Sequence, residues 1–354
     1  MPSTKHAVVT GTASTFHGRS ALQIENSRVR VTVLTEGGHI AEILDKGSNV
    51  NPLWIPPWQS IEPSSYRDGS PDYGNNSESR LLAGIMGHNL CLDFFGPPSS
   101  DEAAAGLTVH GEASIVRYEI SARCEELTAK CNLPLAQLAF ERHIALAGRK
   151  ILFTETVHNL SALDRPIAWT QHVTLGPPFL QVGSTQFRVS ATKSRNAEGQ
   201  IDFDWPLLLR PNGASRDLQL FDPDTPSGGY TAHLLHPQQE KVWFFAFSPI
   251  SNLLLGYVWR REDYPWVGIW EENRSRTTAP WNGRTITRGM EFGVSPFPES
   301  RRAMIERQTL FGTPCYRWLP AKASLQTTYY AAIVPARTIP ENLQEFDGVV
   351  NSIS

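Results

Sequence analysis

Three of the ten histidines lie next to glycine or shortly before a Gly-Pro pair, where regular secondary structure ends and an imidazole can face a cleft. His88 and His110 each have a glycine neighbour, and His172 precedes the Gly-Pro break at residues 176–177. A single histidine more often has a structural role than a catalytic one, because imidazole serves many purposes in proteins. These three histidines are therefore candidates only in combination with other groups.

Carboxylates supply the second half of a possible acid–base pair, because a histidine and a carboxylate can both exchange protons near neutral pH. Glu291 lies in a strand-like run before a proline-containing turn and is one carboxylate that could serve. Its alternative interpretation is a solvated carboxylate at a strand end. Glu271 and Glu272 are rivals, of which at most one can face a cleft, since adjacent strand residues point to opposite faces. Glu112, which follows a His-Gly pair, is a candidate supporting partner.

Two other chemistries stay open at this level. His88, His110 and His172 would suit a three-histidine zinc site, although the chain contains no short-spacing metal motif. Glycoside hydrolysis would need a second carboxylate opposite Glu291. We find no Gly-x-Ser-x-Gly elbow and no phosphate-binding loop.

The elements that must position these residues are predicted to be mainly strands. Short β-branched and aromatic runs alternate polar with apolar residues and end at glycine or proline. The predicted strands include Val29–Leu34, Ile115–Ile120, Leu138–Leu146, Ile151–Val157, Val242–Phe247, Leu253–Trp259, Trp266–Trp270 and Thr327–Ile333. The residues Gly148-Arg149-Lys150 predict a hairpin. Many short strands predict an all-β sandwich or barrel.

Helix signals are rare, and two long loops are expected. Pro298-Glu299-Ser300 predicts the start of a short helix over Arg301–Gln308, and Pro340 suits the first turn of another. Residues 51–79 and 196–229 are rich in Pro, Ser, Asn and Asp, which predicts loops. Long ordered loops in compact domains are often functional.

Four motifs occur in an order that resembles the aldose 1-epimerase (galactose mutarotase) family over most of the chain. They are Glu36-Gly37-Gly38, His110-Gly111, Val157–Ser161 followed by His172, and Gly289–Pro296 with Glu291. The resemblance implies a galactose-mutarotase-like β-sandwich (supersandwich) of mainly antiparallel strands with a few short helices. It implies one such domain over residues 1–354, with residues 1–20 interpretable as an N-terminal extension.

The resemblance also implies a reaction and roles. The expected reaction is anomer interconversion of a sugar by ring opening, with Glu291 as base and His172 as acid. His110 would bind the ring oxygen or polarise it, and no metal or organic cofactor is expected. The expected substrate-binding residues are His88, Asn89, Arg80, Glu112 and Trp270.

The sequence departs from the family pattern at two points. The segment 82–88 lacks the arginine that typical members use to hold sugar hydroxyls, and Arg80, His88 or Asn89 are the possible replacements. The acidic residue that grips sugar hydroxyls in typical members has no evident counterpart. A non-catalytic carbohydrate-binding protein on the same fold, or another sugar-active enzyme such as a lyase or hydrolase, therefore stays open.

Composition limits the partners. The net charge is -3 and no basic stripe is present, so we expect no nucleic-acid partner. No apolar run is long enough for a membrane helix, and residues 1–20 show no signal-peptide pattern. The four cysteines show no disulfide or metal spacing, which favours reduced thiols in the cytoplasm. The expected partner is a small carbohydrate, and the expected state is a monomer or homodimer.

Overall fold

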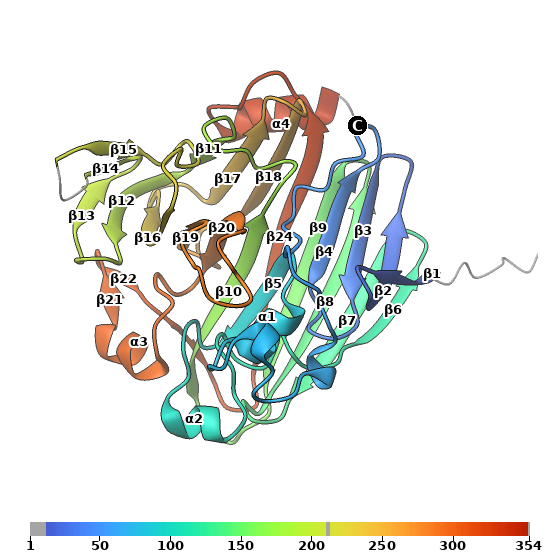
Figure 1. Ribbon diagram of the computed structural model, residues 1–354, viewed down its shortest axis with the longest axis vertical. Coiled ribbons are helices and arrows are strands. Elements are labelled where there is room, and N and C mark those ends of the chain that lie inside the picture. Colours follow the sequence, from blue (N-terminus) through green and yellow to red (C-terminus); the bar gives the residue numbers. More distant parts are fainter. Residues whose placement is uncertain (1–11, 210–212, 353–354) are drawn as a thin grey trace, which may run out of the picture.

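Two large antiparallel sheets make up most of the computed structural model, which describes residues 12–209 and 213–352 (Figure 1). The strands of the larger sheet are β1 Thr12–Phe16, β2 Arg19–Glu25, β3 Val29–Leu34, β4 Ile40–Asp45, β5 His88–Asp93, β10 Arg165–Leu175, β12 Ala191–Asn196, β13 Asp202–Asp204, β16 Ser227–Leu235, β19 Trp266–Asn273, β20 Ile286–Gly293 and β23 Arg317–Leu319. Their order is β1-β2-β3-β4-β5-β10-β20-β19-β16-β12-β13, and β23 pairs with β10.

The smaller sheet packs against the larger one. Its strands are β6 Glu119–Arg123, β7 Glu126–Leu133, β8 Leu138–Ala147, β9 Lys150–Asn159, β11 Gln186–Val189, β17 Lys241–Ser248, β18 Leu253–Arg260 and β24 Ser324–Pro335, in the order β11-β17-β18-β24-β9-β8-β7-β6. Two short hairpins complete the strands: β14 Leu207–Leu209 with β15 Ser215–Asp217, and β21 Thr309–Leu310 with β22 Thr313–Pro314.

The main hydrophobic core lies between the two sheets. Phe292 of β20 stacks on Trp259 of β18, with ring centroids 4.2 Å apart. In β8 and β9 every second residue is buried, as expected for strands with one face on the core and one towards water. A buried ion pair lies within the smaller sheet, where Arg142 Nε of β8 is 2.7 Å from Glu155 Oε1 of β9. Gln171 of β10 links the larger sheet to this pair, because its side-chain amide donates to Glu155 Oε2 at 2.6 Å. These hydrogen bonds help to hold β10 at a fixed height above the smaller sheet.

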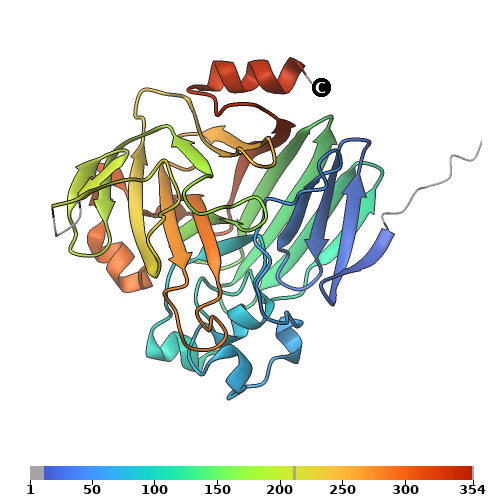
Figure 2. The same ribbon diagram turned by 45° about the horizontal axis from the view of Figure 1, so that its top comes forward.

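Helices and long connections cover the outer faces. The helices are α1 Ser79–Gly84, α2 Ser100–Ala104, α3 Arg301–Arg307 and α4 Leu343–Ser352, with 3-10 turns at Pro63–Ser65 and Pro71–Tyr73. Figure 2 shows α4 lying at the outside of the smaller sheet, where Phe346 stacks on Phe245 at 4.5 Å between centroids. In the described part of the chain, no helix has the length and apolar character needed to cross a membrane.

The strands β5 and β10 are covered on both faces. All six residues of β5 are buried, and so are the last nine of β10. Their outer face lies beneath segments that carry Trp54, Leu81 and Val109, which form a second apolar cluster with Trp281. Because a buried polar group must be paired or used, the polar side chains on this covered face are candidates for function.

The all-β sandwich is confirmed, as are the predicted strands that begin at residues 29, 138, 151, 242, 253, 266 and 327. The hairpin at 148–150 and the helix after Ser300 are confirmed as well, and the Ser300 hydroxyl accepts a hydrogen bond from the amide of Ala303 at 3.3 Å. Helix α4 begins at Leu343 rather than at Pro340, because the Asn342 side chain accepts from the Glu345 amide at 3.0 Å and starts the helix there.

Three expectations need correction. Residues 115–118 form a turn and not a strand, because the amides of Ile115 and Val116 bond to the carbonyl of Glu112 at 2.9 and 3.1 Å. The segment 196–229 is not one loop, since it contains β13, β14 and β15. Residues 12–20 belong to the larger sheet, where the buried Arg19 donates to the carbonyls of residues 36 and 84, and residues 1–11 lie outside the described part.

Candidate active site

One row of side chains crosses four neighbouring strands of the larger sheet. His172 of β10 lies opposite Asn89 of β5 on one side and Glu291 of β20 on the other, and Glu291 lies opposite Gly268 of β19. Directly opposed residues of antiparallel strands share a face. His172 and Glu291, at the centre of this row, form the floor of the candidate site.

His172 and Glu291 contact each other directly. His172 Nε2 lies 2.9 Å from Glu291 Oε1, and His172 Nδ1 lies 2.8 Å from the Thr174 hydroxyl. The two side chains are 7% and 2% exposed. Gly289 makes room for this pair, because a Cβ at that position would lie 2.5 Å from Glu291 Oε1. Both candidate proton-transfer groups are therefore held next to each other.

His110 reaches the pair from a loop. It lies in a turn with φ of 68°, an uncommon conformation for a residue other than glycine. Gly111 follows with φ of 84°, and a Cβ there would lie 2.4 Å from the carbonyl oxygen of Leu92. The His110 ring stacks on Phe95 at 5.2 Å and lies 5.6 Å from the ring of His172.

His110 is uncharged at neutral pH. Burial, followed by the charges of His172 and Arg276, holds the pKa of His110 well below its ordinary 6.5. Its Nδ1 atom has no hydrogen-bond partner among the described residues. A neutral imidazole with a free nitrogen can donate a hydrogen bond to a ligand or accept one from it.

These three residues line a cavity of about 250 Å³ together with the indole rings of Trp270 and Trp281. The ring of Trp270 lies 6.0 Å from His172 and 5.9 Å from Trp281. Leu81, Leu82, Ile85, Val109 and two prolines complete the apolar wall. A small apolar cavity with a few convergent polar groups is the usual form of a small-molecule site.

Arg276 and Glu78 supply charge at the same cavity, and sequence analysis missed both. The Arg276 guanidinium lies over the Trp281 ring at 4.7 Å, and its Nη1 lies 3.4 Å from Glu78 Oε2. Glu272 holds the turn that carries Arg276, since its carboxylate accepts from the amides of Ser275 and Arg276 at 2.5 and 3.0 Å. No sequence signal near either residue marks them, because they are 198 positions apart.

The structure separates His88 and Asn89 from the cavity. His88 points to the interior, where Nε2 lies 3.0 Å from Gln171 Oε1 and Nδ1 lies 3.3 Å from the Tyr257 hydroxyl. Asn89 shares the row of His172 but is fully buried beside Ser114. Neither residue lines the cavity, so the expected contact of either with a substrate is not supported.

Arg80 and Glu112 are also outside the cavity lining. Arg80 is exposed on α1, whose other five residues are buried, because the helix turns its apolar side towards the cluster around Trp54. Glu112 is buried and accepts from the amide of Ala136 at 2.8 Å, so it fixes a neighbouring loop. Of the five expected substrate-binding residues, Trp270 alone lines the cavity.

The rival bases and the zinc alternative do not fit this geometry. Glu271 points to the reverse face and pairs with Arg288 at 2.7 Å, while Glu272 is used in the turn described above. His88 lies on the face of the sheet opposite to His172, so the three histidines cannot share one metal. Within residues 12–209 and 213–352, no cluster of three or more His, Cys, Asp or Glu side chains could hold a metal ion.

Comparison with known proteins gives a structural likeness only. Neither the protein-family models nor the curated proteins contain a match to this sequence. A provisionally named aldose 1-epimerase from Klebsiella pneumoniae superposes with a TM-score of 0.68 at 13% identity, covering 95% of this chain and 83% of that one.

Two further structures extend this likeness. A galactose mutarotase-like protein from Clostridium acetobutylicum gives a TM-score of 0.62 at 13% identity, covering 93% of this chain and 99% of that one. A galactose mutarotase related enzyme from Lactobacillus acidophilus gives 0.59 at 12% identity, covering 90% and 99%. The chain thus has the galactose mutarotase-like fold, at a sequence distance that leaves its chemistry to be argued from its own side chains.

Proposed function

We propose that the protein is an aldose 1-epimerase-like isomerase that interconverts the anomers of a monosaccharide. The contact between His172 and Glu291 at 2.9 Å, on the floor of a cavity that His110 also lines, carries this proposal. The fold shared with mutarotase-like structures supports it.

The reaction moves two protons at one carbon atom. Glu291 takes the proton of the anomeric hydroxyl while His172 gives a proton to the ring oxygen. The bond between the anomeric carbon and the ring oxygen then breaks to give the open-chain aldehyde. Rotation about the neighbouring carbon–carbon bond and the reverse transfers close the other anomer.

The adjacency of the two groups suits this chemistry. The carboxylate of Glu291 and the imidazole of His172 are neighbours on the floor of the cavity. Both reacting oxygens are bonded to the same carbon, so the groups that serve them must lie close together. The Thr174 hydroxyl orients the imidazole from its other nitrogen. The neutral His110 is suited to hydrogen-bond the substrate rather than to deliver the proton.

The walls suit a single neutral sugar ring. Trp270 and Trp281 offer apolar faces to sugar C–H groups, and the Arg276–Glu78 pair offers both donors and acceptors to hydroxyl groups. This pair would take the roles of the arginine and the acidic residue that typical family members have and that this sequence lacks at the matching positions. Since pockets for drug-sized ligands span roughly 300–1,000 Å³, a cavity of about 250 Å³ favours a monosaccharide.

Anomer exchange of freshly dissolved aldoses, followed by polarimetry and NMR, tests the proposal. A broad panel of neutral hexoses and pentoses is required because the sugar is not specified. Glu291→Gln and His172→Asn should each slow the catalysed exchange about 10²-fold or more, by the usual size of acid–base effects. Glu306→Gln, which changes a carboxylate that is 62% exposed on α3, is the matched control and should leave the rate unchanged.

Binding measurements decide between an enzyme and a binding protein. Glu291→Gln should keep measurable affinity for the sugar, because the amide retains the shape of the carboxylate. A sugar that binds the wild-type protein while exchanging at the buffer rate would refute the isomerase proposal and favour a non-catalytic carbohydrate-binding protein.

A further inference from the structure

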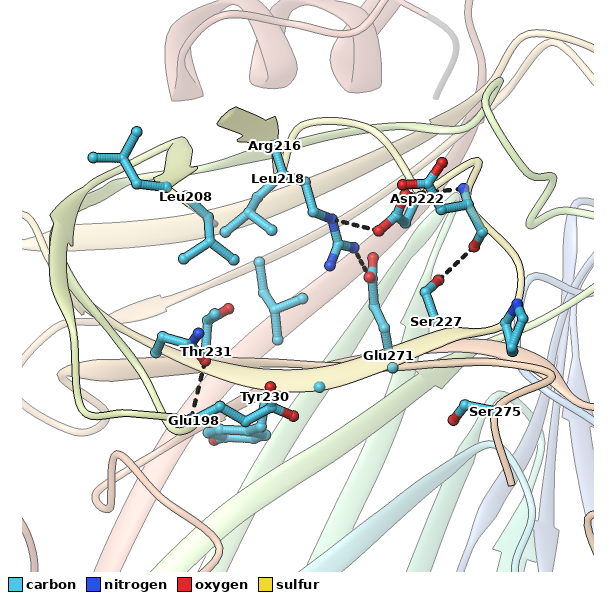
Figure 3. Close-up of a pocket in the computed structure, with 17 residues that line it drawn as sticks. Glu198, Leu208, Arg216, Leu218, Asp222, Ser227, Tyr230, Thr231, Glu271 and Ser275 are labelled. Atoms are coloured by element: carbon cyan, nitrogen blue, oxygen red, sulfur yellow. Dashed lines mark hydrogen bonds and ion pairs between the residues drawn. The ribbon is translucent and has the colours of Figure 1, made fainter. Parts of the chain in front are cut away.

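A second and larger cavity, of about 640 Å³, is drawn in Figure 3. It lies on the reverse face of the sheet from the candidate active-site cavity, which we call the cleft. Strand β19 separates the two cavities. Trp270 lines the cleft, while its neighbours Ile269 and Glu271 line the second cavity. This arrangement follows from the alternation of side chains along a strand. The second cavity takes no part in the proposed ring opening.

The second cavity has walls of two kinds. The hairpin β14–β15 and the residues after it contribute Leu208 and Leu218, which Figure 3 shows on the side across from Thr231. Strand β16 contributes Ser227 and Thr231, and Asn196 and Ser275 add further polar groups. A ligand there would meet an apolar surface on one side and hydroxyl and amide groups on the other.

Buried charges form the base of this cavity. Glu271 is 3% exposed and contacts Arg216 and, at 2.7 Å, Arg288; Asp222 is also 3% exposed and lies 3.1 Å from Arg216. Burying paired ions costs several kcal/mol per ion and is often no better for stability than apolar packing. Three of these groups, Glu271, Arg216 and Asp222, line an open cavity, and their position there is therefore poorly explained by folding alone.

The carboxylate of Glu271 has unused hydrogen-bonding capacity. One guanidinium group lies against each of its oxygens, Arg288 against Oε1 at 2.7 Å and Arg216 against Oε2. A carboxylate can accept about four hydrogen bonds. Glu271 lines the cavity, so donors from a ligand can reach it.

We propose that this cavity binds a neutral saccharide of about two sugar units. The charged side chains at the base of the cavity form ion pairs with one another, so an ionic ligand is not needed to neutralise them. Hydroxyl groups both donate and accept, and they match a wall of carboxylate, guanidinium, hydroxyl and amide groups. The apolar side suits the C–H face of a sugar ring. The inference does not depend on the reaction proposed for the cleft.

Adjacent residues of β19 give a matched pair of variants for the test. Maltose and trehalose are titrated into the full chain by calorimetry and by protein-observed NMR. Glu271→Gln should weaken disaccharide binding about tenfold or more, the loss expected for a hydrogen bond to a charged group. Trp270→Ala, which removes a side chain that lines the cleft and not this cavity, should leave disaccharide affinity unchanged.

A second variant covers the case in which Glu271→Gln fails to fold. Leu208 borders the open space, so the indole of Leu208→Trp enters the cavity and should abolish disaccharide binding without changing anomer exchange in the cleft. Absence of saturable binding of both disaccharides at millimolar concentration would overturn the proposal. So would binding that Trp270→Ala removes and that Glu271→Gln and Leu208→Trp leave intact.

Discussion

Acid should destabilise this protein steeply, and His39 provides a measurable part of the effect. His39 is completely buried, with Nε2 3.0 Å from the carbonyl oxygen of Ser114. Burial, followed by the charge of Arg19, lowers the pKa of His39 from 6.5 to about 3. Above pH 6.5 the imidazole is neutral in both the folded and the unfolded chain, so it adds no pH dependence.

Below pH 6.5 the unfolded chain binds a proton that the folded protein does not. The free energy of unfolding therefore falls by about 1.36 kcal/mol per pH unit from this residue until the pH approaches the folded value. At about pH 4.5, roughly two units lower, the loss is ~2.7 kcal/mol. This is a large part of a total stability of ~5–15 kcal/mol. His233, whose pKa burial also lowers to about 3, should contribute similarly.

The variant His39→Gln isolates this contribution, because its amide can still donate to the Ser114 carbonyl but does not titrate. Urea unfolding of both proteins, followed by tryptophan fluorescence, gives the free energy of unfolding at several pH values. The difference between variant and wild type should shift in favour of the variant by ~2.7 kcal/mol between neutral pH and about pH 4.5. If both proteins lose stability equally over this range, His39 is not held neutral in the folded state.

Two further outcomes are expected. Arg276→Met keeps an apolar stem against Trp281 but removes the guanidinium. In steady-state anomer exchange, KM for the sugar should therefore rise about tenfold or more, while kcat changes less. An unchanged KM would exclude Arg276 from sugar binding. Ser300→Ala removes the side-chain cap of α3 and should lower the free energy of unfolding by ~1 kcal/mol in urea titrations; Arg302→Ala, on the exposed side of α3, should cost less.

Regular strands were predictable from sequence because their pattern is local. The hairpin β8–β9 has one buried face, so every second residue is buried and most of these residues are apolar, and the turn is marked by Gly148. The same pattern wrongly predicted a strand at residues 115–118. The run there contains β-branched residues but forms a turn, in which backbone amides donate to the carbonyl of Glu112. A local pattern cannot report such a tertiary contact.

The candidate site was predictable in part. The order of motifs led to His110, His172 and Glu291, which the structure brings to one cavity. His88 was misassigned because β5 is buried on both faces, so its composition does not tell which side faces the cleft. Arg276 and Glu78 could not be found, because distant turns bring them together and neither has a local signature.

The length of β19 before Trp270 decides which side chains of this strand enter each of the two cavities. A single-residue insertion or deletion before Trp270 would rotate every later side chain of the strand to the other face. The indole would then enter the reverse cavity, and the carboxylate of Glu271 would enter the cleft beside Glu291. A change in the loops around one cavity leaves this alternation intact, but a change in the length of this strand would disrupt both cavities at once.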